Sequence, residues 1–126
     1  MKTINSRLSA DDTVKKLLAG IETENMRVVA HINGQANAAK MGKQVPADQI
    51  LEVFRPDFAI KVWDACKPAG IEIPLRIHIY EYGDAVIVSC RKPSSVFAKF
   101  SSAELNEIGV ELDAIFNQIL AYVTDA

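Results

Sequence analysis

Three side chains that can bind anions or exchange protons stand at alternate positions of one short stretch. In the segment Pro74–Tyr80, Arg76, His78 and Tyr80 alternate with aliphatic residues. This alternation is typical of a strand that buries one face, so the three side chains are expected to share the opposite face. A guanidinium binds carboxylates or phosphates, an imidazole exchanges protons near neutral pH, and a phenol adds a flat wall and a hydroxyl. The spacing therefore predicts either an anion site or a polar strand face with cross-strand charge pairs.

The second histidine, His31, falls by the same alternation on the polar side of its own strand. If the two strands are neighbours, His31 and His78 approach one another, and Glu81 or Cys90 can complete a metal site. However, the sequence has no His-x-His or Cys-x-x-Cys unit, so we predict no metal. A nucleotide cofactor is not indicated either, because there is no GxGxxG or Walker pattern.

Two function classes remain open for these residues. In the first, the chain is a small homodimeric binding or accessory module whose polar sheet face either meets its symmetry mate or holds a small anionic ligand. The candidate contacts for such a ligand are His31, Arg55, Arg76, His78 and Tyr80. In the second, it is a small enzyme in which His78 or His31 is the acid or base and Arg76 holds an oxyanion. We favour the binding module, because burial by a partner or ligand would explain the mixture of apolar and polar side chains on an open sheet face.

The two cysteines offer a third possibility, a thiol-redox protein. Cys66 falls on the apolar stripe of a predicted helix and is expected to be a core residue. Cys90 ends a strand directly before Arg91 and Lys92, and those cations would lower the pKa of the thiol if it is exposed. The alternative is that Cys90 packs against the helices and has no redox role.

Composition limits the protein classes further. The chain has 126 residues, of which 49% are hydrophobic and 24% charged, which is typical of one globular domain. Its 14 basic and 16 acidic side chains give a net charge of -2, which argues against nucleic-acid binding. The sequence shows neither a secretory signal nor a run of about 18 apolar residues, so we expect a cytoplasmic protein without membrane contact.

The elements that must position these side chains follow from periodicity and capping signals. Ser9 with Asp12 forms a capping box for a helix that runs to about Glu24, and Ser101 with Glu104 forms another for a long C-terminal helix. One or two helical turns are expected within Gln35–Lys43 and a helix, capped by Asp57, over Phe58–Gly70. Alternating or apolar runs predict the strands Lys2–Leu8, Met26–Asn33, Gln49–Phe54, Leu75–Tyr80 and Ala85–Cys90.

This order, β-α-β-(α)-β-(α)-β-β-α, predicts an α+β fold in a single domain over residues 1–126, with the long last helix starting at about residue 102. Hairpins and returning helices favour a mainly antiparallel sheet of about five strands, with its helices packed on one face. Arg76, His78 and Tyr80 would then point from the face without helices.

The order of features from Val14 to Val96 resembles the domain-of-unknown-function family 302. The shared features are a strand entering a small-residue helix, a strand ending at a proline turn, a helix, and a "PLR" strand with an acidic residue before its hairpin. They correspond here to Ile32–Gly42, Ile50–Pro56, Phe58–Cys66, Ile73–Arg76 and Glu81. Arg55 stands where the family commonly has asparagine, and "IPL" replaces "LPL". The resemblance implies a TATA-binding-protein-like sheet and a homodimer, and it implies no established activity.

Overall fold

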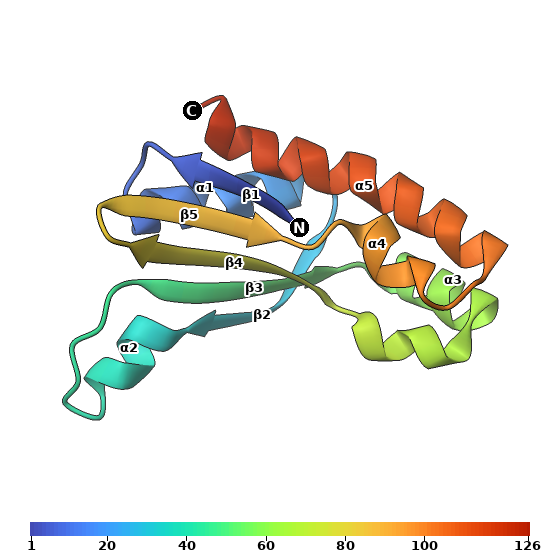
Figure 1. Ribbon diagram of the computed structural model, residues 1–126, viewed down its shortest axis with the longest axis horizontal. Coiled ribbons are helices and arrows are strands. Elements are labelled where there is room, and N and C mark those ends of the chain that lie inside the picture. The colour runs from blue at the N-terminus through green and yellow to red at the C-terminus, as the bar shows by residue number, and fades with distance from the viewer.

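The sheet has five antiparallel strands in the spatial order β1-β5-β4-β3-β2 (Figure 1). A computed structural model describes all residues from Met1 to Ala126. The strands are β1 (Lys2–Ser6), β2 (Arg27–Asn33), β3 (Asp48–Phe54), β4 (Leu75–Tyr82) and β5 (Ala85–Cys90). The α+β class and the five-stranded antiparallel sheet are therefore confirmed.

The long helices cover one face of this sheet. They are α1 (Ala10–Thr23) and α5 (Ala103–Thr124), which pack side by side, with α3 (Pro56–Ala65) beyond them (Figure 1). The short helices are α2 (Gly34–Ala39), the 3-10 helix η1 (Lys67–Glu72) and α4 (Pro93–Ala98). Helix α2 projects from one end of the sheet and buries no residue. None of these helices has the length and apolar character that crossing a membrane requires.

Local signals explain how the two long helices begin. Ser9 caps α1, because its side chain accepts a hydrogen bond from the Asp12 backbone N–H at 3.1 Å. For α5 the expected cap is wrong by one residue: Ser102, not Ser101, accepts from the Leu105 N–H at 3.2 Å. Ser101 instead has a φ of 54°, in the left-handed region, and so forms the turn before the helix.

The middle of the chain needs two more corrections. Helix α3 begins after Arg55 with Pro56 in its first turn, so Asp57 lies inside the helix and does not cap it. The helix ends at Ala65, and the residues after it form η1 instead of continuing to Gly70. Helix α4 was not expected at all, although Pro93 at its start is a known signal for a first turn.

One core lies between the sheet and the helices. Strand residues that face the helices are fully buried, among them Leu51, Val53, Ile77, Ile79 and Val88. They pack in one cluster with apolar residues of the helices, including Leu17, Phe58, Phe97, Leu112 and Phe116. The opposite side of the sheet, which we call the open face, has no helix on it. Function must therefore be sought first on side chains of the open face.

Candidate functional site

Arg76, His78 and Tyr80 lie together on the open face of β4. Their strand neighbours Leu75, Ile77 and Ile79 are buried against the helices, as the alternation predicts. In the pairing of β3 with β4, Glu52 lies opposite Arg76, Ile50 opposite His78, and Asp48 opposite Tyr80. Directly paired residues of antiparallel strands share a face, so two carboxylates accompany the three predicted side chains.

Both carboxylates are engaged by the predicted residues. Arg76 Nε donates to Glu52 Oε2 at 3.2 Å, and His78 Nε2 donates to Asp48 Oδ1 at 2.9 Å. The Tyr80 ring stacks on the imidazole with centroids 4.5 Å apart and planes inclined by 24°. These contacts fix the direction of His78 and partly neutralise Arg76, which is the cross-strand pairing that the sequence allowed as an alternative.

A groove of about 480 Å³ lies at one end of the open face and takes in Arg76 and His78. We call it the open-face groove. Its floor is formed by Ile50, Glu52, Arg76, His78 and Ser89. The segment Ile71–Leu75, from the end of η1 to the start of β4, forms a wall, and Met1, Arg91 and Val96 complete the lining. The groove therefore combines an aliphatic wall with several charged groups, which is typical of small-molecule sites.

Most charges of the groove are already paired. Glu72 forms an ion pair with Lys99, and Glu52 is paired with Arg76. Arg91 is exposed and has no carboxylate within ion-pair distance. It is the functional candidate that sequence reasoning missed, because we considered it only as a neighbour of Cys90. The sequence feature that could have indicated Arg91 is its position as a cation directly after the end of a central strand.

His31 does not lie with His78, and the expectation of a shared face is wrong. His31 pairs with Leu51, which pairs in turn with Ile77, so all three face the helix side of the sheet. There His31 Nε2 meets Oε1 of Gln49 at 2.6 Å, and that glutamine is only 4% exposed. His31 thus satisfies a buried amide. No group of three His, Cys, Asp or Glu side chains is arranged to hold a metal ion.

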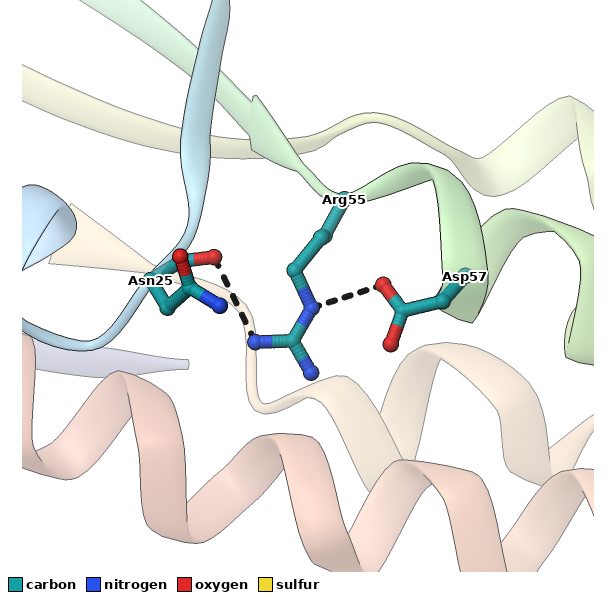
Figure 2. A network of polar contacts seen from close by, with 3 residues as sticks. All are labelled: Asn25, Arg55 and Asp57. Atoms are coloured by element: carbon teal, nitrogen blue, oxygen red, sulfur yellow. Dashed lines mark hydrogen bonds and ion pairs between the residues drawn. The ribbon is translucent and has the colours of Figure 1, made fainter.

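Arg55 lies apart from the groove, at the junction of β3 and α3. Its Nη1 donates to the Asn25 carbonyl oxygen at 3.3 Å and its Nε to Asp57 Oδ1 at 2.7 Å (Figure 2). The guanidinium also lies 4.6 Å from the centroid of the Phe58 ring. The hydrogen bond from Arg55 lowers the pKa of the Asp57 carboxyl. These contacts tie the turn after α1 to the start of α3, which is a structural role.

Cys90 takes the buried one of its two expected placements, and Cys66 is less buried than the core position that we expected. Cys90 is 3% exposed and faces the core, while Cys66, between α3 and η1, is partly exposed. Burial raises the pKa of the Cys90 thiol to about 11, and the nearby N-terminal ammonium and Lys2 offset this only in part. The thiol therefore stays protonated at neutral pH and donates weakly to the Arg91 carbonyl at 3.3 Å. A nucleophilic Cys90 is not supported by this environment.

Comparisons with known proteins agree with this fold. The family model described as "Domain of unknown function DUF302" matches residues 2–123, a wider span than Val14–Val96, and it includes α5. The crystal structure of an uncharacterized conserved protein DUF302 from Bacillus stearothermophilus superposes with a TM-score of 0.87 at 18% identity. The match covers 97% of this chain and 96% of that one. No curated protein matches the chain. The chain therefore belongs to the DUF302 family, as its sequence features indicate.

Proposed function

We propose that this protein is a small binding module that holds an anionic ligand in the open-face groove. The observation that carries the proposal is Arg91, a cationic side chain without a carboxylate partner in a groove whose other ionic side chains are paired. An unpaired guanidinium can form two parallel hydrogen bonds with a carboxylate or phosphate, which is the strongest polar contact available here. Ser89 and His78, beside it on the floor, can add further hydrogen bonds.

The surroundings of Arg91 strengthen its positive field. Arg91 also borders a second hollow of about 180 Å³, together with Lys2 and Lys92. Lys2 donates to the neutral Asn117 at 2.9 Å, so its charge is not cancelled. The acidic group of this hollow, Asp113, accepts from the Ser94 N–H and lies 4.0 Å from Lys92. Three cationic side chains against one carboxylate favour an anion at this end of the sheet.

Arg91→Gln should abolish anion binding while leaving the fold intact. Binding to the folded state alone raises the free energy of unfolding by about 1.4 kcal/mol at a tenfold excess over Kd, or about 4 °C in Tm. Thermal unfolding with phosphate or acetate, at ionic strength matched by NaCl, measures this rise. The matched control is Arg7→Gln, because Arg7 is exposed and unpaired and follows the opposite end of β1. A rise that persists in Arg91→Gln, or is absent from the unmodified protein, contradicts the proposal.

The acid/base enzyme is a second candidate, and the contact between His78 and Asp48 favours it. A carboxylate that accepts from Nε2–H leaves Nδ1 as the basic nitrogen of the imidazole. Such an oriented histidine beside an anion-holding arginine is the arrangement that general base catalysis uses. Binding without turnover is the simpler function of the same groove, because no nucleophile adjoins His78 apart from Ser89, whose hydroxyl contacts Thr3.

We also propose that the protein is a homodimer, joined through β2. This strand is at the edge of the sheet, so its outer backbone N–H and C=O groups are unpaired within the monomer. It exposes Val28, Val29 and Ile32, with Val29 61% exposed. Antiparallel pairing of β2 with β2 of a second copy around a two-fold axis would bring these exposed apolar residues of both strands to one seam. A second copy is the occupant that this self-complementary strand fits, and the open-face groove stays accessible.

Val29→Lys should convert the dimer to a monomer, because it places a charge at the centre of an apolar seam. Light scattering at low micromolar concentration should give twice the monomer mass for the unmodified protein and the monomer mass for the variant. Val110→Lys is the control, since Val110 is 64% exposed on α5, away from β2. A monomer mass for the unmodified protein, or a dimer that survives Val29→Lys, contradicts this seam.

A further inference from the structure

The ligand of the open-face groove can be described more closely than as an anion. We infer that it is amphipathic, with one acidic head group at Arg91 and an aliphatic body against the segment Ile71–Pro74. This inference rests on the proposal that the groove binds an anion, and it adds the chemical class of the rest of the ligand.

The wall of the groove presents exposed apolar side chains to the ligand. Ile71 lines the groove and is 83% exposed, one of the two most exposed side chains among the large apolar residues. Ile73, Pro74 and Val96 extend the same apolar lining, and Ile50 adds to the floor. Contact between these apolar side chains and water is unfavourable. An aliphatic ligand would remove their surface from water and so lower the free energy. The exposed Ile71 side chain therefore has a packing role only if a ligand fills the groove.

The distribution of charge separates a head region from a body region. Arg91 is the one unpaired cationic side chain of the groove, and Ser89, two residues earlier, lies on the floor beside it. The two acidic residues of the lining, Glu52 and Glu72, are held by Arg76 and Lys99. One free guanidinium matches one acidic head group, and a ligand with a second charge would meet paired or apolar surroundings elsewhere.

The size of the groove supports a ligand larger than a bare anion. A volume of about 480 Å³ lies within the range of roughly 300–1,000 Å³ that is typical of small-molecule sites. One water takes up about 30 Å³ in the liquid, and an inorganic phosphate or an acetate is only a few times larger. Either anion would therefore fill only a small part of the groove. The remaining space adjoins the apolar wall and suits a chain of several methylenes.

A homologous series of straight-chain acids tests this inference. Affinities of acetate, butanoate, hexanoate and octanoate for the whole chain are measured by calorimetry at constant ionic strength. We expect the affinity to rise about three- to fourfold for each added methylene until the groove is full. Octanol, with the same chain and no charge, should bind at least tenfold more weakly than octanoate.

Two variants assign the two parts of the ligand. Arg91→Gln should weaken all acids by a similar factor, since it removes the contact to the head group. Ile71→Ser should leave acetate unchanged and flatten the increase with chain length. Ile71 is highly exposed, so Ile71→Ser should unfold at the same temperature as the unmodified protein, and this is checked first.

The outcomes separate this inference from the proposal on which it rests. Acids that all bind with equal affinity, and that Arg91→Gln weakens, would overturn the amphipathic ligand while leaving the anion site standing. Absence of binding by any acid or by phosphate would overturn both. Octanol binding as tightly as octanoate would overturn the placement of the head group at Arg91. If Ile71→Ser does not change the rise of affinity with chain length, the apolar wall is overturned.

Discussion

Gly109→Val should lower the free energy of unfolding by about 3 kcal/mol, the largest effect that we expect from an exchange of one glycine. Gly109 lies inside α5 where α4 crosses it. A Cβ atom there would lie 2.7 Å from the Ser94 Cα and 3.2 Å from the Ser94 backbone nitrogen. Both are backbone atoms, so neither can rotate away, and the two helices must separate. Urea denaturation should show a lower midpoint with an unchanged slope.

Alanine at the same position makes the test sharper. In an exposed helix, Gly→Ala is stabilising by about 1 kcal/mol, and the sequence by itself predicts that sign for Gly109. The close approach of Ser94 reverses it, so we expect Gly109→Ala to be less stable than the unmodified protein. Gly20→Ala is the comparison with a milder conflict, because the atom nearest to its added Cβ is Cδ1 of Tyr122 at 2.9 Å, in a side chain, and the nearest backbone atom is the Ile119 carbonyl oxygen at 3.2 Å. A Gly109→Ala protein of raised stability would mean that α4 and α5 do not meet this closely.

The part of the site on β4 was predictable from the sequence because β4 is a central strand. Its neighbours β3 and β5 pair with it on both sides, and the helices bury Leu75, Ile77 and Ile79. Under those conditions the two-residue period reports the face of each side chain directly. Arg76 and His78 could therefore be placed on the open face without knowledge of the fold.

The same reasoning failed on β2 for two physical reasons. A register irregularity between Val28 and Ala30 shifts the alternation along the strand, so that His31 faces the helix side. In addition, β2 lies at the edge of the sheet, where its apolar residues remain exposed and so do not mark the core side. The partner of His31, the buried Gln49, is 18 residues away in the chain, and no local pattern indicates it.

The groove itself has no local signature in the sequence. Arg91 follows β5, Ile71 belongs to η1, and Ile50 belongs to β3, so the lining is assembled only by the tertiary fold. Pairing of the cations also depends on contacts between segments, such as Lys99 with Glu72. The sequence could list the candidate cations, but it could not show which of them stays without a partner.

Because Cys90 is buried, the free energy of unfolding should fall as the pH rises through the alkaline range. Burial raises the pKa of this thiol from its ordinary value of 9.0 to about 11 in the folded chain. Below pH 9 the thiol is protonated in both states, and its full contribution to stability is present. Between pH 9 and 11 only the unfolded chain loses this proton, so the unfolded state is favoured as pH rises. The contribution is lost once the pH has passed about 11.

Comparison with Cys90→Ala should isolate this effect from the other groups that titrate at alkaline pH. The stability advantage of the unmodified protein over Cys90→Ala should shrink by about 2–3 kcal/mol from pH 8 to pH 11.5. Urea denaturation at a series of pH values gives this difference directly. Cys66→Ser serves as the control, because Cys66 is only partly buried and its removal should leave the pH profile nearly unchanged. Parallel profiles for the unmodified protein and Cys90→Ala would show that the thiol is not held in the apolar core, since a solvated thiol titrates alike in both states.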